Sequence, residues 1–170
     1  MSEKDCRAGD WDAIGRADGE RGAPGNEVER HQAACTRYKV TVNEDTWRAG
    51  YAKGLEAFCT PKGGYLAGRD GQRYHDVCFG LDSEDTFRTA YGEGQQAYKL
   101  LGEIRELRRI QNDLEMAALS GDYSDYDTND LRMRAAQVEA ALQGREWELD
   151  ALDTRCAKDY GVSPLARPKR

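Results

Sequence analysis

Residues 46–78, "TWRAGYAKGLEAFCTPKGGYLAGRDGQRYHDVC", decide the fold, because they place many glycines in sequence that otherwise reads as helical. An interior glycine destabilises a helix by about 0.5–1 kcal/mol relative to alanine, so its repeated use needs a compensating gain. Small residues four positions apart lie on one helical face and allow close approach of a second helix. We therefore predict that these glycines lie where helices pack.

The same spacing of small residues occurs four times in the first half of the chain. The copies are "GRADG" at 15–19, "GYAKG" at 50–54, "AGRDG" at 67–71 and "AYGEG" at 90–94, and an aromatic residue closely precedes each one. The competing interpretation is that some of these glycines end helices or form turns. The expected helix-packing residues are Trp11, Gly15, Gly19, Trp47, Gly50, Gly54, Ala67, Gly71, Phe87, Ala90 and Gly94.

Local signals divide this first half into short helices. One is expected over residues 10–20, and a second follows Asn26 as N-cap, with Glu29 completing a capping box. A third helix is expected from Asn43 to about residue 59, where "TPKGG" ends it, and a brief fourth near 65–71. Residues 37–42 alternate weakly and could be extended.

From Ser83 onward the pattern changes to long helices with apolar residues at alternating steps of four and three. Two such runs form a seam and predict an αα-hairpin. They comprise Leu100, Ile104, Leu107, Gln111, Leu114 and Ala118, then Leu131, Ala135, Val138, Leu142, Arg145, Leu149, Leu152 and Cys156. We expect an all-α protein with a Cys- and Gly-rich helical head over 1–82, a long hairpin over 83–160 and a flexible basic tail over 161–170.

Four of the five cysteines lie in the head: Cys6, Cys35, Cys59 and Cys78. They allow three disulfide pairings, of which the local one, Cys6 with Cys35 and Cys59 with Cys78, is the simplest, and the sequence leaves the connectivity open. Disulfides would indicate an oxidising compartment, whereas four reduced, buried thiols would suit a cytosolic protein. Cys156 falls on the hairpin seam as a buried thiol, the alternatives being an intermolecular disulfide or a reactive thiol.

No catalytic constellation is recognisable in the sequence. There is no nucleophile elbow and no phosphate-binding loop, and "DYSDYDTND" at 122–130 lacks the glycine and glutamate of a calcium loop. His31 and His75 lie near Cys35 and Cys78 with spacings that a zinc site would permit, but a metal would compete with the disulfides for the same sulfurs. We expect no enzyme activity, no cofactor and no metal.

The order of cysteines, aromatics and glycines resembles a bacterial family of unknown function, number 2799 in the domain-of-unknown-function series. The resemblance covers residues 5 to about 105, with Phe58 where the family usually has tyrosine. Such proteins are typically short envelope lipoproteins of Gram-negative bacteria, which implies a periplasmic setting and two disulfides but no activity. The matching residues are Cys6, Trp11, Gly15, Asp18, Gly19, His31, Cys35, Gly54, Leu55, Cys59, Gly64, Gly68, Gly71, Tyr74 and Cys78.

These observations predict a non-enzymatic periplasmic or cell-envelope protein that acts as an interaction or structural module. A protein partner or self-association through the hairpin is expected, with a membrane contact only through a lipid anchor absent from this sequence. Nucleic acid is an unsuitable partner because the net charge is -6. The alternative is a small-ligand or metal-binding periplasmic protein that uses His31, His75 and nearby cysteines and tyrosines.

Overall fold

The computed structural model describes residues 1–119 and 125–165, and within them every regular element is a helix. The all-α prediction is confirmed. The chain divides into two compact units, Met1–Gly94 and Gln95–Arg170, and the boundary falls inside a continuous helix. In chain order the helices are α1 (Glu3–Ala8), α2 (Trp11–Glu20), α3 (Glu27–Thr36), α4 (Glu44–Phe58), α5 (Pro61–Arg69), α6 (Glu84–Leu119) and α7 (Asp125–Tyr160).

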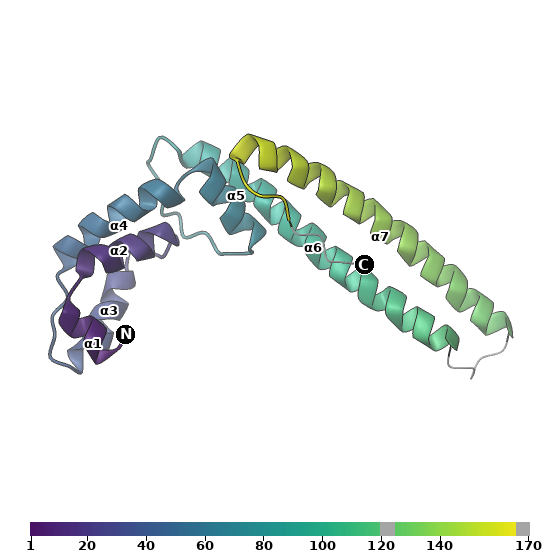
Figure 1. Ribbon diagram of the computed structural model, residues 1–170, viewed down its shortest axis with the longest axis horizontal. Helices are drawn as coiled ribbons and strands as arrows, with labels where there is room; N and C mark the ends of the chain where they lie inside the picture. The colour runs from purple at the N-terminus through teal and green to yellow at the C-terminus, as the bar shows by residue number, and fades with distance from the viewer. Residues whose placement is uncertain (120–124, 166–170) are drawn as a thin grey trace. The chain divides into compact units, whose positions relative to one another are not determined.

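In the first unit, α2 and α4 pack so closely that their backbones touch (Figure 1). A methyl group on Gly15 would lie 2.0 Å from the Trp47 carbonyl oxygen, and one on Gly50 would lie 2.0 Å from the Asp12 carbonyl oxygen. One turn further along, a methyl group on Gly19 would lie 2.9 Å from the Cα atom of Gly54. The four glycines therefore allow two helices to approach closely, and this packing offsets the loss of helix stability that interior glycines cause.

The start of α6 packs on α5 in the same way. A methyl group on Gly64 would lie 2.4 Å from the Phe87 carbonyl oxygen, and one on Gly94 would lie 2.2 Å from the Tyr65 carbonyl oxygen. The expected role of Gly71 is corrected: it is exposed with φ of 70° and forms the turn after α5. Gly64 and Gly68 take the helix-packing positions of α5 instead.

The two helix pairs are structural repeats of each other. The start of α4, "NEDTWRAGY" at 43–51, corresponds to "SEDTFRTAY" at 83–91, and both α2 and α5 end in a turn that a left-handed glycine closes. The amide of Gly22 donates to the carbonyl of Gly19 at 2.9 Å, and that of Gly71 donates to Gly68 at 3.0 Å. These turns place Asp18 and Ala67 at equivalent positions, while the helices that follow make Trp47 equivalent to Phe87.

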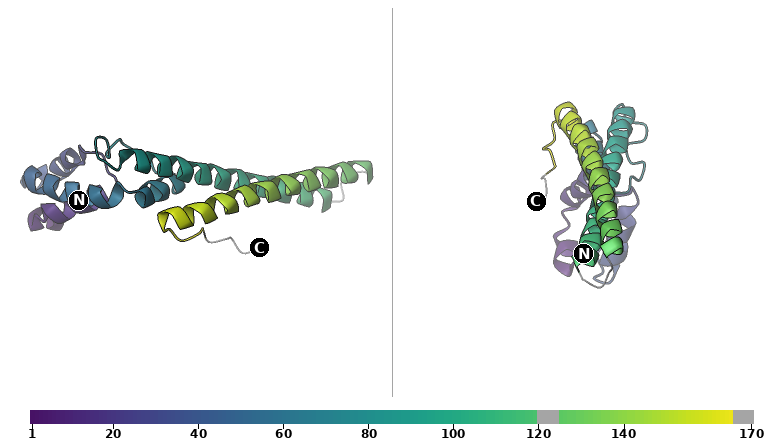
Figure 2. Two further views of the ribbon diagram at one scale, coloured as in Figure 1. Left: turned by 90° about the horizontal axis from the view of Figure 1, so that it is seen from above. Right: turned by 90° about the vertical axis from the view of Figure 1, so that its right-hand side faces the viewer.

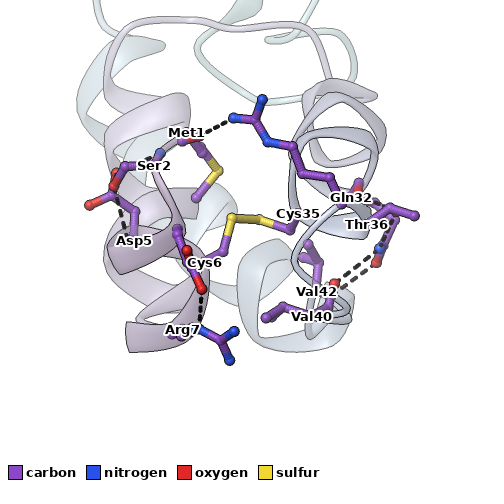
Figure 3. The surroundings of a disulfide bond; sticks show 12 residues. Met1, Ser2, Asp5, Cys6, Arg7, Gln32, Cys35, Thr36, Val40 and Val42 are labelled. Carbon is purple, nitrogen blue, oxygen red and sulfur yellow. Dashed lines mark hydrogen bonds and ion pairs between the residues drawn. A yellow bond between two sulfur atoms is a disulfide. The ribbon is translucent and has the colours of Figure 1, made fainter.

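Each repeat is closed by its own disulfide. Cys6 of α1 is bonded to Cys35 of α3 (Figure 3). The Arg37 guanidinium, just after α3, donates to the Met1 carbonyl oxygen at 3.2 Å. Cys59 is bonded to Cys78 across α5 and the loop that follows. The structure therefore has the local pairing. Closing chains of 19 and 29 residues destabilises the unfolded state by about 3 kcal/mol each in the chain-entropy model.

Several helix ends differ from the sequence predictions. Asn26 precedes α3 but makes no side-chain cap, so the expected capping box is absent. Residues 37–42 form turns and irregular backbone instead of an extended segment. The short helix α1, which Ser2 and Asp5 cap reciprocally, was not predicted. Helix α5 begins earlier than expected, because Thr60 caps it and Pro61 occupies its first turn.

In the second unit, α6 and α7 run alongside each other in opposite directions (Figures 1 and 2). Two ion pairs join them: Arg108 to Glu146 at 2.6 Å and Arg145 to Glu103 at 2.9 Å. Arg145, one of the predicted seam residues, is therefore exposed and forms an ion pair across the hairpin. Part of the acidic connection and most of the basic tail, 120–124 and 166–170, lie outside the described residues.

None of the described helices combines the length and the apolar run that crossing a membrane requires.

Candidate functional site

Helix α7 has a second apolar face that points away from α6. Helical geometry places Met133, Ala140 and Trp147 opposite the seam residues Leu142 and Leu152, about half a turn around the helix. Met133 is 64% exposed and Trp147 is 73% exposed, whereas both leucines are buried. A large aromatic side chain left this exposed is typical of a binding surface.

This outward face of α7 contains no charged residue over five helical turns, although a third of the residues in the chain are charged. Its centre is open, because a methyl group on Gly144 would meet no atom within 4 Å. Depletion of charge together with an exposed tryptophan is the composition of an interface core. The outward face consists of Met133, Ala136, Gln137, Ala140, Gln143, Gly144, Trp147 and Ala151.

In the first unit, the Asp18 carboxylate is the centre of a buried polar network. Asp18 is 3% exposed, and its Oδ2 atom accepts from Trp47 Nε1 at 2.8 Å and contacts His31 Nε2 at 2.7 Å. Its Oδ1 atom accepts from the Arg21 guanidinium at 2.6 Å. These partners satisfy a carboxylate whose burial would otherwise be costly, and they fix the orientation of the His31 ring.

The same network affects Tyr51, which stacks on Trp47 at a centroid distance of 4.7 Å. Burial and, secondarily, the negative charge of Asp18 raise the pKa of Tyr51 to about 12. The Tyr51 hydroxyl donates to the Ala23 carbonyl oxygen at 2.6 Å. Tyr51 is therefore a protonated donor that ties α4 to the turn after α2.

A pocket of about 310 Å³ lies beside this network, between α1 and the following helices. Its wall combines an apolar side, from Met1, Ala8 and Ile14, with three polar side chains, Asp5, Asp10 and His31. The His31 side chain lines this pocket and is only 12% exposed. Its Nε2 atom contacts Asp18. The volume is at the lower end of the range for small-molecule sites.

The sequence-predicted site residues separate into distinct regions. His31 contributes to the pocket, whereas His75 is exposed in the loop before Cys78 and does not line it. A Cys2His2 zinc site would need the sulfurs of Cys35 and Cys78, which are both in disulfides. No group of three metal-ligating side chains occurs within the described ranges. Cys156, outside both disulfides, is buried.

The aromatic and small residues predicted to pack helices are all buried, with Gly71 as the exception. They are Trp11, Gly15, Gly19, Trp47, Gly50, Gly54, Ala67, Phe87, Ala90 and Gly94.

Sequence reasoning missed two features. The outward face of α7 had a usable signal, since Met133, Ala140 and Trp147 recur at steps of seven as the seam residues do. The Asp18 network has no signal in the local spacing of residues, because Trp47 is far from Asp18 in the chain.

Comparison with protein-family models matches residues 10–96, more than half of the chain, to a family described as protein of unknown function (DUF2799). The match spans both helix-pair repeats and includes Asp18, His31 and Trp47. No curated protein and no solved structure matches the chain.

Proposed function

This chain belongs to the DUF2799 family of proteins of unknown function, and we propose that it is a non-enzymatic structural module of the cell envelope. In this proposal the disulfide-closed head is the scaffold, and the hairpin joins a second copy of the same chain through the outward face of α7.

The two disulfides support the envelope setting. Each closes one repeat of the head, and disulfides of this structural kind form and persist in oxidising compartments such as the periplasm. The head also needs them, because its helices are short and rich in glycine. In a reducing compartment it would lose about 3 kcal/mol for each disulfide.

The outward face of α7 is the observation that carries the proposal. Ala136, Ala140 and Gly144 repeat the spacing of small residues that packs helices in the head. In both repeats of the head, one stripe of small residues lies directly on another. The same stripe on α7 is exposed, and the large exposed side chains of Met133 and Trp147 lie at its two ends. These two side chains would pack beside the stripe of a second helix.

A second copy is the occupant that fits this face best. A twofold arrangement would set the stripe of one α7 on that of its partner, which repeats the helix contact seen in the head. Electrostatic repulsion would be small, because residues 95–170 contain 12 basic and 14 acidic side chains, a net charge of only -2. Two uncharged faces can thus meet without burying an unpaired charge.

Sedimentation velocity on the intact oxidised chain over a range of concentrations tests this proposal. We expect a reversible dimer that Ala140→Glu converts to a monomer, since the new carboxylate would be buried without a partner. The matched control is Ala141→Glu, which adds the same charge one residue further along and 100° around the exposed surface of α7. Circular dichroism verifies that both variants fold.

A wild-type chain that stays monomeric at every concentration would overturn the proposal. Equal weakening of the dimer by both substitutions would do so as well, because it would place the contact elsewhere.

A further inference from the structure

We propose that two copies of the chain meet through α7 in antiparallel directions, with the twofold axis of the pair at Ala140. This inference rests on the proposed self-association, and it specifies how the second copy lies on the outward face of α7.

The largest side chains of the outward face are placed symmetrically about Ala140. Met133 lies seven residues before Ala140 and Trp147 seven residues after it, and both are mostly exposed. Each is therefore about 10 Å from Ala140 along the helix axis and within about 20° of its direction. In an antiparallel pair, Met133 of each copy would lie beside the partner's Trp147. A thioether packs favourably against an aromatic ring, so this arrangement joins complementary side chains.

The residues nearer the centre are complementary in size in the same arrangement. Ala136 and Gln143 lie on one flank of the face, and Gln137 and Gly144 lie on the other. An antiparallel pair would set Ala136 beside the partner's Gln143. On the other flank it would set Gln137 beside the partner's Gly144. Each glutamine thereby meets a small residue, whereas a parallel pair in register would set glutamine on glutamine.

The charges beside the face also favour the antiparallel direction. Residues 130–134 contain two arginines and one aspartate, a net charge of +1, and residues 146–150 contain two glutamates and one aspartate, a net charge of -3. The two segments are equally distant from Ala140. An antiparallel pair would therefore set each positive segment against a negative one, whereas a parallel pair in register would set the two negative segments together.

Arg134 and Glu148 are the charged side chains placed best to pair across this contact. Both lie on the same flank of the face, about 100° around the helix from Ala140, so in an antiparallel pair Arg134 would be within reach of the partner's Glu148. Within its own helix, Arg134 pairs with Asp130 at 2.9 Å, and Glu148 pairs with Arg145 at 2.7 Å. These exposed pairs contribute little stability, so both side chains can turn towards a partner at little cost.

The helix pairs of the head run in the same direction, which makes a parallel contact the competing model. Gly15 of α2 lies against Trp47 of α4. One turn further along α2, Gly19 lies against Gly54. In the head, however, α3 connects the two helices and returns the chain to the end where α2 began. Two separate copies have no such connection, so side-chain complementarity selects the direction.

Trapping of the dimer by an engineered disulfide tests the direction. Ala136→Cys and Gln143→Cys chains, only one of them labelled with nitrogen-15, are mixed and mildly oxidised with the native disulfides intact. In an antiparallel pair, like positions are about 9–12 Å apart along the axis, and a disulfide spans Cα atoms no more than about 7 Å apart. We therefore expect cross-linked dimers of mixed label, with positions 136 and 143 joined in their peptide maps. A parallel pair would give dimers of uniform label.

A charge reversal provides a second measurement that needs no cross-link. Arg134→Glu should weaken the dimer about fivefold in sedimentation velocity, because it sets carboxylates together at two symmetric places in the contact. Adding Glu148→Arg to the same chain should restore the affinity. The matched control is Arg105→Glu, which makes the same charge change on the exposed surface of α6 and should leave the dimer unchanged.

Cross-linked dimers of uniform label, or a dimer that forms but gives no cross-link, would overturn the antiparallel contact. An Arg134→Glu dimer as stable as the wild type would do so too. The proposed self-association would survive these results if Ala140→Glu still abolishes the dimer. A wild-type chain that stays monomeric would overturn both proposals.

Discussion

Gly50 shows how the absence of one methyl group permits two helices to pack. Its Cα–H faces the backbone of Asp12, and the nearest atom is a carbonyl oxygen rather than the end of a flexible side chain. A clash with backbone cannot be relieved by a change of rotamer, so α2 and α4 would have to separate along their whole contact.

We therefore expect Gly50→Ala to destabilise the protein by about 1–3 kcal/mol or more, as overpacking of a rigid core does. Gly92→Ala is the matched control, because a methyl group there meets no atom within 4 Å. It should stabilise the protein by about 0.5–1 kcal/mol through helix propensity. Urea denaturation measures both changes. Similar stability of the two variants would contradict the close packing.

The raised pKa of Tyr51 predicts how the stability of the protein responds to alkaline pH. Its pKa is about 12 in the folded protein and 10.0 ordinarily, so between these values the folded chain retains a proton that the unfolded chain releases. The free energy of unfolding should therefore fall as pH rises from 10 towards 12. Tyr51→Phe should flatten this fall. Denaturation at a series of alkaline pH values measures it, and an unchanged slope in the variant would contradict the assignment.

At the scale of helices and turns, each disulfide belongs to one helix-pair repeat. Replacing both Cys59 and Cys78 with alanine should lower the free energy of unfolding by about 3 kcal/mol and should loosen α5 and the loop after it. The pair α2 and α4 keeps its own disulfide and its glycine contacts, so its amides should stay protected in hydrogen exchange. Equal loss of protection in both repeats would show that they are not separate units.

Which helices form, and where most begin, could be predicted from local patterns. Asn43 is an example, since its side chain accepts from the Thr46 amide as expected. Which residues of α5 face its partner helix could not be predicted, because Gly64–Gly68 and Ala67–Gly71 have the same spacing. The choice depends on the helix start at Thr60, which leaves Gly71 beyond the last turn. The Asp18 network is a tertiary feature that local spacing does not encode.

At the scale of the whole molecule, we propose that the two units have separate tasks. The first, Met1–Gly94, has the disulfides, the glycine contacts and the pocket beside His31. The second contains the hairpin, whose α7 helix has apolar residues on opposite sides. An exposed face that lacks charged residues and includes a tryptophan has the composition of a surface that a partner covers. We therefore propose that the protein assembles through α7.

A photoreactive amino acid in place of Trp147, activated in intact cells that contain the protein, tests assembly through α7 most directly. Mass spectrometry of the products should find a species of twice the chain mass in which residue 147 is joined to α7 of a second copy. Cross-links that reach only other proteins, or only other parts of the chain, would contradict it.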